Sequence, residues 1–591
     1  DMYVKCGVLA KAQHVLERLS ARNEVCWSAV IAGYIQQGLC HEAITCFEWM
    51  LKEGFSPNAV TLICILKACG NLGAIVKGKL IHNVIISSGL LEKDIAIGTA
   101  LVDMYARCGM LVKAQDVLEE LPLRNVVCWN ALIGGYAQEG HGNEAINCFQ
   151  QMQREAISPS IVTFISILKA CTKIGAIKKG IKIHSEILSR GLLMKDIVLG
   201  TTLVDMYAKC GALAEAQQVL ERLPTRDVVA WNSLISGYAQ KGHDHETLHC
   251  FARMQMERLS PNEITFNCIL QACASIGAIE KGQKLHDEIL EGHFLENNVV
   301  LGTSLVDMYA KCGFLERAHE VFHTLILPQD VVLWTALIAG YAENGFAVEA
   351  LQCFEKMQKC GVSPNALTFM YSLRACCDSG AMDKGYQMHA EIERNGLLGR
   401  EMALNHNLIA MYAKCGMLTV AQHIFDKLLV RDLVVWTPLI IGYAQIGQSQ
   451  NVFHIFDQMQ EEGIKPDAIT FVSILNACSR TFSSEKSHTY FEAMSKRYGI
   501  IPTVEHHCCM VDLHSRAGQL DEAIEIIRKM PISPNLGVWH AFLSACTNWG
   551  NAFLGKHAFE HARSLDNKDA ATFVLMSHIQ EMEIQAQRAR S

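Results

Sequence analysis

The stretch V-V-C-W-N-A-L-I-G-G-Y at residues 126–136 sets the pattern for the whole chain. Its apolar residues Trp129, Leu132, Ile133 and Tyr136 fall at i, i+3, i+4 and i+7, which is the spacing of one face of an α-helix. After two glycines the same spacing begins again. The stretch therefore predicts the first helix of a helical hairpin.

The tryptophan of this stretch returns at a nearly constant spacing of 102 or 103. Its positions are Trp27, Trp129, Trp231, Trp334, Trp436 and Trp539. The string D-M-Y-x-[KR]-C-G keeps the same interval, beginning at Asp1, Asp103, Asp205 and Asp307. A fixed interval of this kind indicates a repeat protein.

Each interval contains six successive segments of helical periodicity, and no alternating strand pattern interrupts them. One hairpin cannot bury its apolar stripe alone, whereas stacked hairpins bury it continuously and curve as they stack. We therefore predict an all-α fold, a right-handed superhelical α-solenoid of stacked helix-turn-helix repeats that forms one elongated body. Its functional surface should be the concave face lined by the first helix of each hairpin.

Composition excludes several classes of function. Half of the 591 residues are hydrophobic and 19% are charged, which is not the composition of a disordered chain. Lys and Arg number 52 against 60 Asp and Glu, so the net charge of −8 gives no strong overall attraction to nucleic acid or to an anionic membrane. No apolar run reaches the roughly 18 residues that a membrane span needs, and we expect no membrane partner.

The 24 cysteines do not form metal motifs, because no two of them lie three apart and C-x-x-C is absent. We expect five cysteines that keep the repeat interval to be small packing residues: Cys6, Cys108, Cys210, Cys312 and Cys415. Three H-x-E strings also keep the interval, at His184, His286 and His389, and we interpret His184 as a core histidine. Adjacent residues on a helix diverge, so the cluster His506, His507, Cys508 and Cys509 is not predicted to bind a metal. We expect no metal and no cofactor.

The internal spacing distinguishes between kinds of helical repeat. Equivalent positions at Trp129, Phe164, Gly200 and Trp231 divide the interval into units of 35, 36 and 31 residues. A tetratricopeptide array would keep one repeat length of about 34 residues throughout. The unequal units resemble the pentatricopeptide repeat family of plant organelles, in its P-L-S triplet form.

Three strings carry the resemblance: V-V-C-W-N-A-L-I-G-G-Y at 126–136, V-T-F-I-S-I-L-K-A-C at 162–171 and L-V-D-M-Y-A-K-C-G-A at 203–212. The resemblance implies a partial S-type repeat at 1–23 and fifteen repeats at 24–535. Residues 536–591 then look like an E-type helical extension, cut short at Ser591. We expect the chain to begin inside a repeat, so that any transit peptide lies outside it.

The resemblance also implies that a repeat reads one RNA base through its fifth and last residues. In P-type repeats these pairs are Ser28 with Asn58, Asn130 with Ser160, Asn232 with Asn262, Thr335 with Asn365, and Thr437 with Asp467. In S-type repeats they are Thr99 with Asn125, Thr201 with Asp227, and Thr303 with Asp330. Short polar side chains beside an apolar residue on the first helical turn suit recognition of base edges. The alternative is that these residues merely cap helix starts.

Other repeats depart from this pattern. The fifth residues of L-type repeats are mostly apolar: Ile63, Ile165, Asn267, Met370 and Val472. An apolar side chain cannot hydrogen-bond a base edge, so we expect these repeats to act as spacers or to contact RNA without selectivity. The pairs His406 with Asp432 and Cys508 with Asn535 are left without an assigned base.

By resemblance, the chain is a sequence-specific binder of single-stranded RNA in the mitochondrion or chloroplast, and a specificity factor for C-to-U editing. It lacks the zinc deaminase motif, H-x-E followed by C-x-x-C, so it is not expected to be an enzyme. Its partners would be organellar RNA and a deaminase-bearing protein or editing accessory factor bound through the E-like region. RNA stabilisation or processing is an alternative role, and a peptide-binding tetratricopeptide-like scaffold is an alternative of another class.

Overall fold

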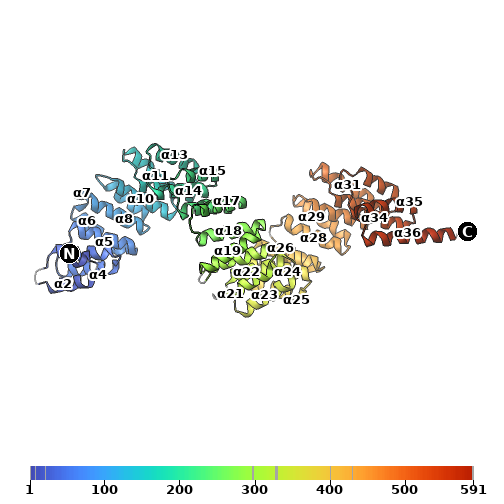
Figure 1. Ribbon diagram of the computed structural model, residues 1–591, viewed down its shortest axis with the longest axis horizontal. Helices are drawn as coiled ribbons and strands as arrows, with labels where there is room; N and C mark the ends of the chain where they lie inside the picture. Colours follow the sequence, from blue (N-terminus) through green and yellow to red (C-terminus); the bar gives the residue numbers. More distant parts are fainter. Residues whose placement is uncertain are drawn as a thin grey trace. The chain divides into compact units, whose positions relative to one another are not determined.

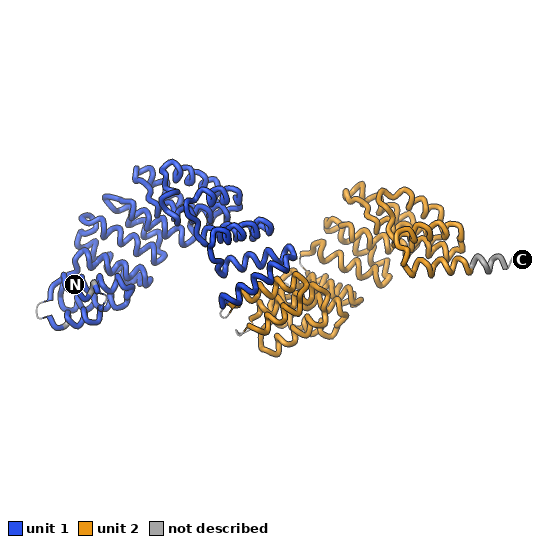
Figure 2. Tube along the Cα trace, in the orientation of Figure 1, with its two compact units in different colours: residues 1–294 blue, residues 295–591 orange. Residues whose placement is uncertain are grey.

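The computed structural model describes residues 2–6, 8–19, 22–295, 298–325, 330–398, 401–428 and 430–588. All regular elements in these ranges are helices, stacked as antiparallel pairs within each part of the chain (Figure 1). The chain divides into two compact units, residues 1–294 and 295–591 (Figure 2). Among the described helices, none combines the length and the apolar character that a bilayer span requires. The predicted all-α solenoid of stacked helix-turn-helix repeats is confirmed in each unit.

Three kinds of hairpin alternate along the chain. The first kind carries the repeated tryptophan, and we call its members the tryptophan hairpins: α3 (Glu24–Gln36) with α4 (Cys40–Lys52), α10 (Val126–Glu139) with α11 (Gly142–Arg154), α16 (Val228–Gln240) with α17 (Asp244–Met256), α22 (Val331–Glu343) with α23 (Ala347–Lys359), and α28 (Leu433–Gln445) with α29 (Ser449–Glu461).

The second kind carries a threonine as the third residue of its first helix. These threonine hairpins are α5 (Ala59–Leu72) with α6 (Ile75–Ser87), α12 (Ile161–Ile174) with α13 (Ile177–Ser189), α18 (Glu263–Ile276) with α19 (Ile279–Glu291), α24 (Ala366–Ser379) with α25 (Met382–Arg394), and α30 (Ala468–Arg480) with α31 (Ser484–Lys496).

The third kind has a second helix of only nine or ten residues. These short hairpins are α8 (Ile95–Arg107) with α9 (Leu111–Glu120), α14 (Ile197–Lys209) with α15 (Leu213–Arg222), α20 (Val299–Lys311) with α21 (Leu315–Thr324), α26 (Met402–Lys414) with α27 (Leu418–Asp426), and α32 (Val504–Arg516) with α33 (Leu520–Lys529). The remaining helices are α1 (Met2–Lys5), α2 (Leu9–Arg18), α7 (Leu90–Lys93), α34 (Leu536–Trp549), α35 (Ala552–Leu565) and α36 (Ala570–Arg588).

The start of each first helix follows the spacing expected from the sequence. Helices α10, α12, α14 and α16 begin at Val126, Ile161, Ile197 and Val228, so their starts keep the 35, 36 and 31 spacing. The short unit arises from its second helix, because α15 has 10 residues where α11 and α13 have 13. A left-handed glycine ends α12, since Gly175 adopts a φ of 66° that a side chain would disfavour.

The tryptophans of the tryptophan hairpins form the core of the stack. Each of them is at most 3% exposed: Trp27, Trp129, Trp231, Trp334 and Trp436. In unit 2 the Trp334 and Trp436 rings meet the rings of Phe322 and Phe425 from the preceding hairpin edge-on, each at 4.5 Å between centroids. The expected packing role is therefore confirmed, and the indoles are not available to stack on RNA bases.

The prediction for the periodic cysteines is wrong in part. Cys6 is exposed, which contradicts the packing role, whereas the other four are half-buried C-caps of first helices: Cys108, Cys210, Cys312 and Cys415. Each sits where a helix ends and the chain turns away from the core. The cysteines that end the L-x-A-C string of the threonine hairpins are all fully buried: Cys69, Cys171, Cys273, Cys376 and Cys478.

The histidine of the H-x-E string at residue 184 packs inward, as predicted. His184 is half-buried, and its Nδ1 lies 2.9 Å from the Tyr207 hydroxyl. The same pairing joins His82 to Tyr105 at 2.9 Å and His389 to Tyr412 at 3.0 Å. Burial lowers the pKa of all three histidines below the ordinary value of 6.5. Within the described residues, no three His, Cys, Asp or Glu side chains gather as a metal site.

Replacing Trp231 by Ala should lower the free energy of unfolding of unit 1 by about 3–5 kcal/mol, because a fully buried indole leaves a cavity that the stack cannot fill. Chemical denaturation followed by circular dichroism measures the loss. Val229 is 59% exposed on the same helix, and Val229→Ala is the matched control that should change stability little. Equal effects of the two substitutions would contradict the core assignment.

Acid should destabilise the chain through the tyrosine-paired His82, His184 and His389. Their folded-state pKa is depressed, so their stabilising contribution is complete above the unfolded pKa of about 6.5 and is lost as the pH falls below it. A variant with Gln at His82, His184 and His389 should show a smaller drop in melting temperature between pH 7.5 and 5.5 than the parent. A control variant with Gln at the exposed His41, His245 and His249 should behave as the parent does. An unchanged drop in the first variant would refute this assignment.

Candidate nucleic-acid interface

In unit 1 the first helices of successive hairpins line a groove. Residues of α5, α8, α10 and α12 enclose a volume of about 720 Å³. Its lining includes Ile63, Thr99 and Asn130, each the fifth residue of its helix. The fifth positions of three consecutive hairpins therefore open into one groove.

The lining of this groove is positively charged although the whole chain is acidic. The groove and the hollow next to it on α12 and α14 are lined by five cationic and two anionic side chains: Lys67, Arg107, Lys169, Lys173 and Lys209 against Asp103 and Asp205. Two of these cations pair with an aspartate one turn earlier, with Arg107 Nε 2.8 Å from Asp103 and Lys209 Nζ 3.0 Å from Asp205. The remaining positive charge suits a polyanion.

The paired residues predicted from the sequence meet in the tryptophan hairpins, although each pair spans a whole repeat of the chain. Asn232 Nδ2 donates to Asn262 Oδ1 at 2.7 Å, and Asn130 Nδ2 donates to the Ser160 hydroxyl at 3.0 Å. A fifth residue therefore touches the residue just before the next first helix. The Ser28 hydroxyl likewise lies 3.2 Å from Asn58 Oδ1.

In the other two tryptophan hairpins the pair is connected through a threonine. The Thr335 hydroxyl lies 2.7 Å from that of Thr368, which donates to Asn365 Oδ1 at 2.9 Å. The same chain runs from Thr437 through Thr470 to Asp467, with distances of 3.2 and 2.7 Å. All five predicted pairs of this kind are thus parts of one polar cluster each.

The pairs of the short hairpins are looser. The Thr201 hydroxyl lies 3.4 Å from Asp227 Oδ1. Thr99 and Thr303 instead donate to the backbone carbonyl four residues earlier, at 2.8 and 2.9 Å. Among the described contacts, neither reaches its predicted partner. The unassigned His406 does reach its own, with Nε2 3.4 Å from Asp432 Oδ1.

The capping alternative is confirmed for the last residue of every pair. Each last residue is the N-cap of the next first helix and accepts a backbone N–H: Asn58, Asn125, Ser160, Asp227, Asn262, Asp330, Asn365 and Asp467. Capping occupies one atom of an amide or carboxylate. Within the described residues, Asn262 Nδ2 and Asp227 Oδ2 have no partner, so a cap can also hold a ligand.

An exposed aliphatic side chain stands beside each polar cluster. It is the second residue of the first helix and is 47–68% exposed in these cases: Val25, Val60, Val127, Val162, Val198, Val229, Ile264, Val300, Val332, Leu367, Val434 and Ile469. A flat ring can lie between two such side chains, because burial of its faces is favourable. The first turns therefore combine edge recognition with apolar contact.

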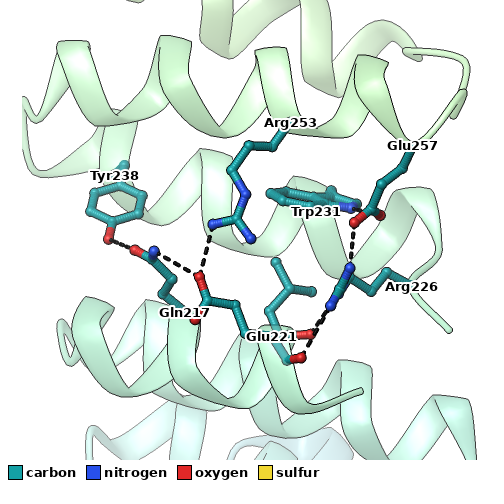
Figure 3. Close-up of polar contacts among 8 residues, drawn as sticks. Gln217, Glu221, Arg226, Trp231, Tyr238, Arg253 and Glu257 are labelled. Atoms are coloured by element: carbon teal, nitrogen blue, oxygen red, sulfur yellow. Dashed lines mark hydrogen bonds and ion pairs between the residues drawn. The ribbon is translucent and has the colours of Figure 1, made fainter. Parts of the chain in front are cut away.

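An arginine clamp holds the backbone in front of Asp227 (Figure 3). Arg226 Nε donates to the Leu220 carbonyl at 2.8 Å and forms an ion pair with Glu257. The Trp231 indole N–H donates to the same carboxylate at 2.9 Å. The clamp ties the end of α15 to α17 and so fixes the residue that caps α16. Three other arginines also directly precede a capping residue and form an ion pair with a glutamate: Arg22, Arg124 and Arg431.

Sequence reasoning missed the threonines that complete the clusters. They keep the repeat interval and could have been found from it: Thr61, Thr163, Thr265, Thr368 and Thr470. Polar residues also occupy the fifth position, the cap and the third position in the C-terminal helices. There His540 Nε2 lies 2.8 Å from Asp569 and 2.9 Å from the Thr572 hydroxyl.

Hairpins stacked with a polar row along their first helices define the chain as an α-helical repeat protein. Two sequence signatures identify the kind of repeat. The PPR repeat family signature matches residues 22–71, 124–173, 226–275, 329–378 and 431–480, and the PPR repeat signature matches 99–126, 264–294, 303–326 and 506–533. The chain belongs to the pentatricopeptide repeat family.

Relatives of similar architecture support this membership. A chloroplastic pentatricopeptide repeat-containing protein of Arabidopsis thaliana is 33% identical over 98% of this chain and 66% of its own length. A mitochondrial one from the same plant is 35% identical over 98% of this chain and 56% of its own length. The chain therefore spans about two thirds or less of these relatives. The solved structure of the pentatricopeptide repeat protein PPR10 in complex with an 18-nt psaJ RNA element has the same fold, with a TM-score of 0.59 at 17% identity over 100% of this chain and 88% of that one.

Proposed function

We propose that this protein binds single-stranded RNA and reads its bases one hairpin at a time. The observation that carries the proposal is the meeting of each fifth residue with the cap of the next first helix in the tryptophan hairpins. Two polar side chains from distant parts of the chain converge there beside exposed aliphatic residues. One base read by two side chains per helical repeat is an established mode of RNA recognition.

The caps supply a chemical reason for base selectivity. A capping Asn uses Oδ1 for the backbone and leaves the donor Nδ2, as Asn262 does. A capping Asp leaves an acceptor oxygen, as Asp227 does. Guanine presents N–H donors on its Watson–Crick edge, whereas adenine presents the acceptor N1, so Asp should favour G and Asn should favour A when the fifth residue is Thr or Ser.

The relatives and the groove agree with this proposal. Two relatives are named as chloroplastic and mitochondrial, which supports a location in a plant organelle. PPR10, which shares the fold, is described in complex with RNA. The net positive lining of the groove in unit 1 offers local attraction to phosphates that the overall charge of −8 does not.

We further propose that the bound RNA is a C-to-U editing site. The tryptophan, threonine and short hairpins would correspond to P-, L- and S-type repeats over residues 24–535, preceded by a partial repeat at 1–23. Residues 536–591 would be an E-like extension that recruits a deaminase-bearing protein or an accessory factor. The catalytic step would then occur in the partner, and the protein itself would not be an enzyme. Stabilisation or processing of organellar RNA is the alternative role.

A peptide-binding scaffold is the second candidate, because tetratricopeptide repeats share the helix-turn-helix unit. The 35, 36 and 31 spacing of the first helices and their paired polar residues argue against it. A scaffold of this kind should bind peptides and show no preference among RNA sequences.

Replacing Thr201 by Asn together with Asp227 by Ser should change the preferred base at one position from G to C. The acceptor oxygen is lost, and the new pair repeats the chemistry of Asn130 with Ser160. The family resemblance implies that Asn with Ser or Asn favours a pyrimidine, mostly C. In titrations of RNAs that differ at this base alone, the parent should prefer G and the variant should prefer C, each by about 5- to 100-fold in affinity. This ratio corresponds to about 1–3 kcal/mol per base read.

The matched control changes a threonine and an acidic residue away from the groove. Thr489 and Glu485 are exposed on the second helix α31, and Thr489→Asn with Glu485→Ser should leave the base preference unchanged. If the Thr201 and Asp227 variant kept the preference of the parent for G, these side chains would not be base readers.

A further inference from the structure

One fully buried threonine recurs where each threonine hairpin begins. It is the third residue of α5, α12, α18, α24 and α30, with no exposed surface: Thr61, Thr163, Thr265, Thr368 and Thr470. A hydroxyl buried this completely must be hydrogen-bonded. In every case its partners are the fifth and last residues of the tryptophan hairpin that comes before it.

The bonds of Thr265 show how the hydroxyl is used. The Asn262 backbone N–H donates to Thr265 Oγ1 at 3.2 Å, and Thr265 Oγ1 donates to Asn232 Oδ1 at 2.6 Å. The hydroxyl therefore accepts from the backbone, and the nearer of its two acceptors is the Asn232 amide oxygen, since Asn262 Oδ1 lies farther away at 3.1 Å. Asn232 Nδ2 consequently faces the other way and donates to Asn262 Oδ1 at 2.7 Å.

We call this arrangement, in which a threonine hydroxyl accepts from the cap backbone and donates to the fifth residue, the relay. The same relay fixes Asn130 in an earlier repeat. The Ser160 backbone N–H donates to Thr163 Oγ1 at 3.0 Å, and Thr163 Oγ1 donates to Asn130 Oδ1 at 2.5 Å. The Asn130 amide nitrogen then donates to the Ser160 hydroxyl. An asparagine amide can flip over and exchange the positions of its donor and acceptor. The threonine hydroxyl favours one of these two orientations at both sites.

The first helices of the tryptophan hairpins and of the short hairpins lack this hydroxyl. The third residue of the first helix is apolar or cysteine in the tryptophan hairpins, at Cys26, Cys128, Ala230, Leu333 and Val435. It is apolar in the short hairpins α8, α14, α20 and α26, at Ile97, Leu199, Leu301 and Leu404. Among the three kinds of hairpin, the relay therefore belongs to the pairs of the tryptophan hairpins, and a cluster of the same kind joins His540, Asp569 and Thr572 in the C-terminal helices.

We propose that the threonine of each threonine hairpin is a positioning residue that sets which hydrogen-bonding group the preceding fifth residue presents to its base. This inference rests on the proposed reading of RNA by the paired residues. It gives the threonine hairpins a role in selectivity that their mostly apolar fifth residues do not suggest. An asparagine held with its oxygen inward offers an N–H donor, which selects a base edge that carries an acceptor.

The test measures base selectivity at the position that Asn232 and Asn262 read. Thr265→Val keeps the branched shape and removes the hydroxyl, so the Asn232 amide can turn. The ratio of its affinities for the preferred base and for the other bases at that position should fall about 5- to 10-fold, which corresponds to the loss of one hydrogen bond. Discrimination at the other positions should be kept. Thr265→Ser restores the hydroxyl and should restore the selectivity.

A buried threonine outside the clusters provides the control. Thr247 on α17 is also fully buried, and its hydroxyl donates to the His243 carbonyl at 2.9 Å. Thr247→Val should leave the pattern of base discrimination as in the parent. Thermal melting of all variants shows how far each one is destabilised, and a folded Thr163→Val variant tests the same relay at another base.

The outcomes separate this inference from the proposed function. If the parent discriminates among bases at this position and Thr265→Val does so equally well, the positioning role is wrong and the reading of RNA stands. A uniform loss of affinity for all sequences in Thr265→Val, with no recovery in Thr265→Ser, would also overturn the positioning role. If the parent itself shows no base preference, the proposed function fails first.

Discussion

The cap at the start of each first helix is the interaction on which the polar face depends. The first backbone N–H groups of an α-helix have no partner within the helix, and a side-chain oxygen at the N-cap supplies one. In this chain the capping residue also lies against the fifth residue of the preceding first helix, as Asn262 does against Asn232. Helix geometry and the position of the polar cluster are therefore set by the same atoms.

This dependence links stability to recognition. Burial of Trp231 and the stacking of apolar stripes hold the first helices at a fixed separation. The arginine clamp at Arg226 then fixes the approach of the chain to the cap at Asp227. A change in the core would shift the caps, and a shifted cap would move the reading atoms. Selectivity in such a molecule is a property of the stack rather than of two side chains alone.

Much of the fold could be predicted from the sequence because the apolar spacing and the repeat interval are strictly kept. The starts of α10, α12, α14 and α16 and the burial of the tryptophans follow directly from them. The packing role expected for the periodic cysteines fails at the exposed Cys6, and Cys108 is a half-buried C-cap, since a regular interval does not distinguish a helix end from a buried face. The pairing of Thr201 with Asp227 could be anticipated only through the family resemblance. The relay through Thr265 was missed because Thr265 and its partner Asn232 lie on two different hairpins.

The charge of the groove could not be deduced from composition. The overall balance of −8 suggests a poor partner for nucleic acid, yet Lys67, Arg107 and Lys169 gather on the groove side of unit 1. The carboxylates that make the chain acidic lie largely elsewhere. Modest local charge would limit attachment to arbitrary RNA and leave base recognition with a larger share of the binding free energy.

Selection from a pool of random RNA sequences with the unmodified chain tests the central claim most directly. The family resemblance implies that the N-terminal hairpin lies at the 5′ end of the RNA. The order of the paired residues, from the N-terminal hairpin to the C-terminal one, then predicts enrichment of A, A, C, G, a pyrimidine, G, A and G in the 5′ to 3′ direction. One unread base should separate each tryptophan-hairpin base from the next short-hairpin base, and two should separate the last A from the last G. Recovery of sequences with no common pattern would contradict the account.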